Sequence, residues 1–137
     1  MIISGYSFDK ENGITHKLNI INNKSMPFLQ YIANGLKKAE GRVTTKTVKK
    51  FRVGDNLSLI ANKEYVLSEI VYLNFYKSFE EMLLKEGLKN MLPFVNSFEE
   101  GIKIYNSFPG ASRVKKLGCC AIGVKYISGK LNFEINK

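Results

Sequence analysis

Short runs in which apolar and polar side chains alternate are spread along the chain. Residues 39–44 and 57–61 follow this pattern, with a period of two that is typical of strands with one buried face. Residues 65–76 form a long β-branched and aromatic run, and residues 117–127 form an apolar run, so both are predicted as strands. Shorter strands are expected at residues 2–8, 15–21 and 131–135.

Three segments combine helical spacing of apolar residues with the polar residues that cap helix ends. The first, residues 27–34, follows Ser25, which we expect to cap its N-terminus, and it stops before Gly35. The other two begin after Ser78 and Ser97, and each serine is followed three residues later by a glutamate, as in a capping box. The inner faces of these two helices are expected to hold Met82, Leu83 and Leu84 in one and Ile102, Tyr105 and Phe108 in the other.

Turn signals separate the strands, and the helices are inserted between them. The strongest are Asn12-Gly13, the segment 51–55, and Ser128-Gly129-Lys130, which is expected to form a hairpin turn before the last strand. The chain has no internal repeat, low-complexity tract or Pro/Ser linker, so residues 1–137 are predicted to form one domain. The fold class is α+β, a small β-barrel with inserted and flanking helices, because closure removes the exposed edges of the strands.

The charge of the chain points to an anionic partner. Its 137 residues include 21 Lys and Arg against 12 Asp and Glu, a net charge of +9, which favours binding of nucleic acid or a phosphorylated ligand. Residues 36–52 hold seven basic groups with Glu40 as the single acid, and residues 113–130 hold five basic groups with none. If the strand at 117 pairs beside the strand at 39, these segments share a face and form a groove that tracks phosphates; otherwise they are two solvated lysine-rich stretches.

One histidine and two adjacent cysteines limit the available chemistry. Cys119 and Cys120 exclude a disulfide framework and the usual zinc site, and we expect buried, reduced thiols and therefore a reducing, cytoplasmic environment. His16 is expected to be solvated or to cap a backbone group. The sequence shows no secretory signal and no apolar run near the ~18 residues of a membrane span, so no membrane partner is expected. No metal or cofactor is expected either.

The segment from Gly35 to Arg42 has the form GxKxxExR. A glycine that ends a helix turns the chain sharply, and the following strand places Glu40 and Arg42 on one face. Lys37, on the loop, is expected to swing over the same cleft. An acid between two bases keeps all three groups ionised even when they are partly buried.

Over about residues 15–128 the chain resembles the ASCH domain family of the PUA-like superfamily of small β-barrels. The resemblance implies a single ASCH domain in which strand extensions flank the matching region at both ends of the chain. It also implies a cleft lined by the GxKxxExR residues. In order, the matching features are the helix at 27–34, the motif at 35–42, the turn at 51–55, the strand at 65–76, the helix start at 78–83, Lys85-Glu86-Gly87, Leu92-Pro93, Tyr105 with Phe108, and the strand at 118–127.

The resemblance further implies a link to RNA, because the family is associated with RNA binding and processing. We expect an RNA-binding protein with a positively charged cleft that acts in RNA processing or regulation, its partner being single-stranded RNA or a nucleotide-like ligand. Some relatives are ribonucleases or amidohydrolases, so the alternative is a hydrolase of RNA phosphodiesters or of a modified nucleoside such as N4-acetylcytidine. The amidohydrolases carry a threonine where this chain has Glu40, which departs from their pattern. Whether the chain is an enzyme stays open, as does a protein-interaction adaptor with an acidic partner.

The site residues follow from the motif and from the basic segments. In an RNA-binding module, Lys37 and Arg42 contact a phosphate or base edge, and Glu40 orients them or accepts an amino proton. In a hydrolase, Lys37 stabilises negative charge and Glu40 is the general base. Tyr105, with Tyr76 as a second candidate, either stacks on a splayed base or is a core aromatic. The expected binding residues are Lys37, Arg42, Thr44, Lys49, Lys50, Tyr105, Lys115 and Lys116.

Overall fold

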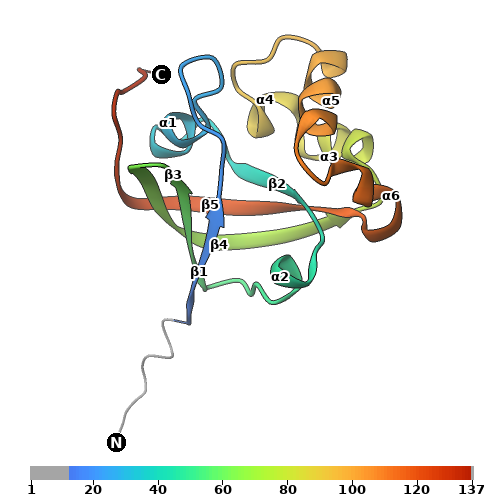
Figure 1. The fold of residues 1–137 in the computed structure, drawn as a ribbon, viewed down its shortest axis with the longest axis horizontal. Coiled ribbons are helices and arrows are strands. Elements are labelled where there is room, and N and C mark those ends of the chain that lie inside the picture. The colour runs from blue at the N-terminus through green and yellow to red at the C-terminus, as the bar shows by residue number, and fades with distance from the viewer. Residues whose placement is uncertain (1–12, 137) are drawn as a thin grey trace, which may run out of the picture.

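The computed structural model of the protein describes residues 13–136, which form an α+β fold around one mixed sheet (Figure 1). In the described part of the chain the sheet has five strands in the order β1-β3-β4-β5-β2, and it curls into a half-barrel. β1 pairs with β3 in parallel, and the other neighbours are antiparallel. The strands are β1 (Thr15–Asn19), β2 (Ala39–Val43), β3 (Asn56–Ala61), β4 (Glu64–Tyr76) and β5 (Cys119–Lys130).

The two long strands β4 and β5 give the sheet its curvature. They pair along nearly their whole length, and the register shifts between Leu67 and Ser68 and again between Ile70 and Tyr72. Such irregularities bend a strand and increase its twist. The bend brings the two edge strands together, since the Nη2 atom of Arg42 on β2 donates to the carbonyl of Asn19 at the end of β1 over 2.6 Å.

Helices cover the sheet on both of its faces. α3, α4 and α5 form a layer on one side (Figure 1), and none of the helices in the described part of the chain has the length and apolar character of a membrane span. The helices are α1 (Phe28–Ala33), α2 (Lys46–Lys49), α3 (Phe79–Glu86), α4 (Leu88–Met91), α5 (Phe98–Ser107), the short 3₁₀ helix η1 (Ala111–Arg113) and α6 (Val114–Leu117).

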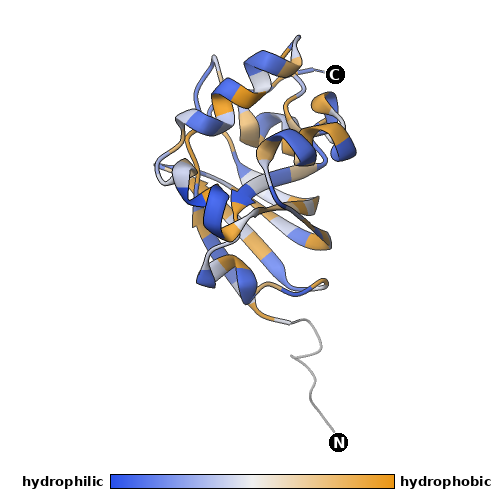
Figure 2. Ribbon diagram, turned by 90° about the vertical axis from the view of Figure 1, so that its right-hand side faces the viewer, coloured by the Kyte–Doolittle hydropathy of each residue, from blue (hydrophilic) through white to orange (hydrophobic). Residues whose placement is uncertain are grey.

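The sheet separates two apolar cores, because successive side chains of a strand point to opposite faces. β5 is accordingly buried at every residue from Cys119 to Val124, and Figure 2 shows the hydropathy of the strands between the two cores. One core lies under α3, α4 and α5, and the other lies inside the curl of the sheet against α1 and α2. Cys119 belongs to the first core and Cys120 to the second. Both thiols are buried and free, as predicted, and burial raises the pKa of each to about 12.

Most predicted elements are present. The strands predicted at 15–21, 39–44, 57–61, 65–76 and 117–127 are confirmed as β1 to β5, with small differences at their ends, and so are the two serine caps. The Ser78 and Ser97 hydroxyls each accept a hydrogen bond from the amide of the glutamate three residues later, both over 3.1 Å. Ser25 does not cap α1, because the helix begins only after Pro27 and its Leu29 amide donates instead to the Asn22 side chain over 2.9 Å.

The C-terminal prediction is wrong. β5 runs on to Lys130, which pairs with Tyr65, so residues 128–130 are strand and not a hairpin turn. Residues 131–136 form no strand. They are held instead by side chains: the buried carboxylate of Glu64 accepts from the Asn132 amide over 2.8 Å, and Asn34 donates to the carbonyl of Ile135 over 3.2 Å. The strand predicted at 2–8 and the start of the turn at Asn12 lie outside the described residues.

Two predictions about single side chains are also wrong. Leu84 is 71% exposed and takes no part in the core. His16 is not solvated, because its Nε2 atom lies 2.7 Å from the Asp55 carboxylate and its ring packs against Phe51 with 4.5 Å between ring centroids. The predicted turn at 51–55, to which Asp55 belongs, is confirmed. The contact between His16 and Asp55 therefore links β1 to that turn.

The carboxylate of Glu86 joins the end of α3 to the outer part of β4. It accepts hydrogen bonds from the Tyr72 hydroxyl over 3.2 Å, from the Asn74 amide over 2.8 Å and from the Tyr76 hydroxyl over 2.5 Å. Burial, with the negative charge of Glu86, raises the pKa of Tyr72 to about 12 and also raises the pKa of Tyr76. The Tyr76 hydroxyl therefore belongs to a structural cluster.

This cluster predicts a loss of stability at alkaline pH. Folded Tyr72 keeps its proton to a higher pH than the unfolded chain does, so above pH 10 the folded state binds more protons and the free energy of unfolding falls until about pH 12. The Tyr72→Phe variant should lose stability less steeply over this range. Urea denaturation at several pH values measures both slopes, and parallel profiles for the two proteins would contradict the assignment.

Candidate functional site

A cavity of about 400 Å³ opens where the edge strands β1 and β2 approach each other. Within residues 13–136 neither edge has a further strand beside it, and the gap is bounded on one side by residues 18–21 and on the other by residues 40–43. Its volume lies at the lower end of the range for small-molecule sites. The rest of the wall comes from α1, α2 with its N-cap, α3 and the segment from α5 to η1: Phe28, Thr45, Val48, Phe79, Tyr105, Phe108, Pro109, Ala111 and Arg113.

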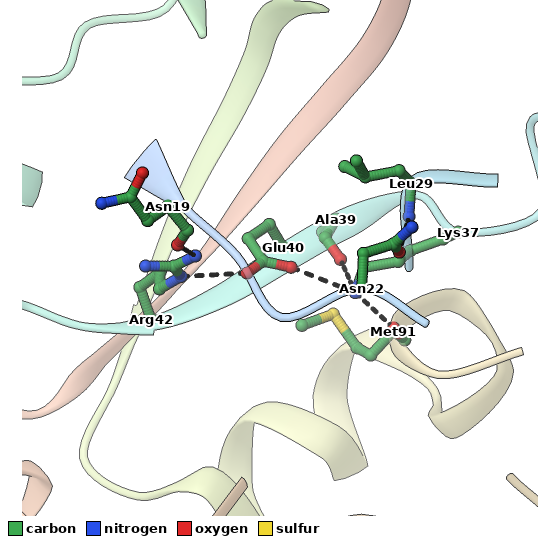
Figure 3. A network of polar contacts seen from close by, with 8 residues as sticks. All are labelled: Asn19, Asn22, Leu29, Lys37, Ala39, Glu40, Arg42 and Met91. Carbon is green, nitrogen blue, oxygen red and sulfur yellow. Dashed lines mark hydrogen bonds and ion pairs between the residues drawn. The ribbon is translucent and has the colours of Figure 1, made fainter. Parts of the chain in front are cut away.

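The motif residues form one network of charges at this gap (Figure 3). Arg42 donates from Nε to the Glu40 carboxylate over 2.9 Å, and the Lys37 ammonium lies 3.5 Å from the other carboxylate oxygen. Glu40 and Arg42 lie two residues apart on β2 and therefore share a face, as predicted. Glu40 and Arg42 both line the cavity.

Lys37 does not swing over the cleft, so that part of the prediction is wrong. Its side chain is fully buried and is absent from the cavity wall. The ammonium donates to the carbonyls of Ala39, over 2.8 Å, and Met91, over 2.5 Å. Burial lowers the pKa of Lys37, and the neighbouring charge of Glu40 opposes that shift. The buried Lys37 ammonium thus pairs with the Glu40 carboxylate and links α4 to β2 through the two carbonyls.

Arg42 is the basic group that faces the cavity from the strand. Its side chain is 26% exposed, and its Nε and Nη2 atoms are held by Glu40 and by the Asn19 carbonyl. Within residues 13–136 its Nη1 atom has no hydrogen-bond partner. The guanidinium is therefore fixed in position and keeps donors for a ligand.

Tyr105 is a core aromatic, the second of the two possibilities raised by the sequence. It is 2% exposed. Its ring stacks on Phe79 with 5.2 Å between centroids and meets Phe108 edge-on at 5.8 Å. Burial raises the pKa of its hydroxyl well above the ordinary value. Because Phe79 already covers one face of the ring, Tyr105 contributes to the cavity wall and offers no free platform on that face for a base.

The remaining predicted residues lie either in the interior of the protein or at the surface beside the cavity. Thr44 is buried and does not line it, whereas the next residue, Thr45, lines it and caps α2. The pairing of β2 with β5 that the charge argument required is confirmed. The predicted lysines are exposed and lie on or just after two short helices beside the cavity: Lys49 and Lys50 at α2, and Lys115 and Lys116 on α6.

Arg113 is a cavity residue that sequence reasoning missed. It is exposed, it ends η1 and it lines the cavity opposite the strands. The sequence did indicate Arg113 as a candidate, because it is one of three arginines in the chain and begins the second basic segment. The aromatic wall had no comparable signal, since Phe28, Phe79 and Phe108 come from three helical segments and look like ordinary core residues in sequence.

Two solved structures are similar to this chain in sequence and in fold. The hypothetical protein PH0355 is 33% identical over 84% of this chain and 99% of its own, with a TM-score of 0.70. Protein PF0455 from Pyrococcus furiosus is 34% identical over 82% of this chain and 97% of its own, with a TM-score of 0.66. The chain belongs to the same protein family as these two proteins. No family model matches the chain, and neither does any curated protein.

Proposed function

We propose that this protein binds RNA and takes one unpaired nucleotide of a single strand into the cavity between β1 and β2. The observation that carries this proposal is the Glu40–Arg42 pair, which is oriented by the fold and lies in the wall of an otherwise largely apolar and aromatic cavity. A few well-placed polar groups in an apolar hollow are typical of sites that recognise a planar polar ligand. A nucleobase is such a ligand.

The chemistry of the pair suits the edge of a base. The carboxylate of Glu40 accepts hydrogen bonds, as a base amino or imino group requires, and Arg42 donates to ring carbonyls or nitrogens. Each group is held by a partner on the protein, so little side-chain freedom is lost when a base binds. Aromatic residues of the wall provide apolar contact for the ring.

The surroundings of the cavity suit the phosphate backbone. Arg113 lies in the cavity wall, and the exposed lysines of α2 and α6 follow closely in sequence after wall residues, Val48 for α2 and Arg113 for α6. Lysine holds a phosphate as a point charge and gives affinity without base specificity. With a net charge of +9 the chain is expected to attract an anionic strand from a distance.

We propose further that the chain is an ASCH domain and that its half-barrel is PUA-like. The order of motifs from residue 27 to residue 127 and the position of the GxKxxExR segment beside a cavity both favour it. The hydrolase alternative receives less support from the geometry. Lys37 is buried behind Glu40 and does not line the cavity, so it is poorly placed to stabilise charge on a substrate.

A titration with labelled single-stranded RNA at two salt concentrations tests the proposal. We expect binding at low salt and a linear fall of log affinity with log salt, because phosphate contacts release bound cations. The same sequence as a duplex should bind more weakly, since its bases are not free to enter the cavity. The Lys63→Gln variant, which removes an exposed charge on the turn between β3 and β4, is a matched control with near-normal affinity. No binding at low salt, or equal binding of duplex and single strand, would overturn the proposal.

A further inference from the structure

The hydroxyl of Tyr105 is buried and has no hydrogen-bond partner within residues 13–136. Tyrosine hydroxyls that are buried in proteins usually have a partner, because removing the group from water without one costs free energy. Phenylalanine would fill the same place between Phe79 and Phe108 without that cost. The packing of the described residues therefore explains the ring of Tyr105 but not its oxygen.

The oxygen lies beside the candidate site. The ring reaches β2 at Gly41, the residue between Glu40 and Arg42, where an added Cβ atom would lie 2.9 Å from the hydroxyl. The absence of a side chain at Gly41 is what allows this close approach. Both Tyr105 and Gly41 line the cavity.

The free edge of β2 brings the hydroxyl and the charged pair within reach of one ligand. The Lys38 carbonyl accepts from the Val124 amide of β5, and the Thr44 amide donates to the carbonyl of Gly118, just before β5. The alternation of an antiparallel ladder therefore turns the peptide groups of Gly41 away from β5 and toward the edge. Glu40 and Arg42 leave the strand on one face, and the tyrosine approaches it on the other. A planar ring that lies against this edge would contact both.

We propose that the Tyr105 hydroxyl is a recognition group of the cavity, which donates a hydrogen bond to a ring carbonyl of the inserted base. The inference rests on the proposed function and narrows it, because uracil, cytosine and guanine carry a ring carbonyl and adenine does not. Tyr105 therefore recognises the ligand through its oxygen, in contrast to the stacking contact expected from the sequence.

Access to the hydroxyl requires one small movement. The Met82 methyl group lies beside the same point, 2.8 Å from where a Cβ atom of Gly41 would be. Methionine is unbranched and has three rotatable side-chain bonds, so it adapts readily to a new neighbour. A base that fills the cavity as far as Gly41 displaces this methyl group and meets the hydroxyl.

The Tyr105→Phe variant tests the inference, since it removes the oxygen alone. We expect an unfolding midpoint in urea equal to or above that of the wild type, because no hydrogen bond of the described fold is lost. Oligouridylate, oligocytidylate and a guanosine-rich single strand are first compared on the wild type. For the one that binds best, we expect Tyr105→Phe to bind about tenfold more weakly than the wild type. The affinity for oligoadenylate should be the same in both proteins. Tyr65→Phe, which removes a hydroxyl from an exposed tyrosine outside the cavity, should match the wild type throughout.

The outcomes separate this inference from the function on which it rests. If the wild type binds RNA and Tyr105→Phe binds every oligonucleotide equally well, the hydroxyl is not a recognition group. A lower unfolding midpoint in Tyr105→Phe would show that the oxygen serves the fold, which also overturns the inference. If the wild type binds none of the oligonucleotides at low salt, the proposed function itself is wrong, and the assignment of Tyr105 is wrong with it.

Discussion

Replacing Lys37 with methionine is expected to lower the free energy of unfolding by about 3–5 kcal/mol, which is typical when one partner of a buried ion pair is removed. The methionine side chain fills most of the same space, but among residues 13–136 it leaves Arg42 as the one cation paired with the Glu40 carboxylate, whose side chain is only 7% exposed. The carbonyls of Ala39 and Met91 also lose their donor. A buried acceptor without a partner carries its full desolvation cost.

Urea denaturation of three variants isolates this effect. Lys38→Met changes the next residue, which is exposed, and should remain within about 0.5 kcal/mol of the wild type, as surface substitutions usually do. The double variant Lys37→Met/Glu40→Gln should recover part of the lost stability, since it also removes the carboxylate charge that Lys37→Met leaves behind. A Lys37→Met protein as stable as Lys38→Met would contradict the assigned role of Lys37.

The features that could be predicted from sequence are those that short stretches of chain determine. The serine caps at Ser78 and Ser97 are bonds to a backbone amide only three residues away, and both are confirmed. The alternation in 57–61 depends only on which face is buried, and Leu57 and Leu59 are indeed fully buried. The neighbouring positions of Glu40 and Arg42 follow from the period of one strand.

The features that could not be predicted depend on contacts between distant segments. The C-terminal residues look like a strand, yet Glu64 and Asn34 hold them without one, and nothing near residue 131 in the sequence indicates those partners. The spacing of the motif predicts Lys37 at the cleft, but its ammonium is buried instead, where it donates to the carbonyl of Met91 on α4. The position of a loop side chain relative to an edge strand is a tertiary property, and spacing alone does not determine it.

Replacing Arg42 with lysine is expected to weaken binding of single-stranded RNA by roughly 10- to 100-fold, although the charge is kept. Arg42 reaches the Glu40 carboxylate and the Asn19 carbonyl at the same time, and this double anchorage fixes the donors that face the cavity. Lysine has one compact ammonium group, which does not bridge two partners in a planar fork and still present donors to a base. The variant therefore retains the electrostatic attraction and loses the oriented contact.

The salt dependence of binding distinguishes this contact from a simple phosphate contact. Arg42→Lys should lower the affinity without changing the slope of log affinity against log salt, since the number of neutralised phosphates is the same. Lys49→Gln, which removes an exposed charge beside the cavity, should weaken binding of all sequences alike and reduce the magnitude of the slope by about 0.7. Fluorescence anisotropy at several salt concentrations measures both quantities. Equal affinities for Arg42→Lys and the wild type would mean that Arg42 acts only as a charge, and the base-recognition part of the proposed function would then be wrong.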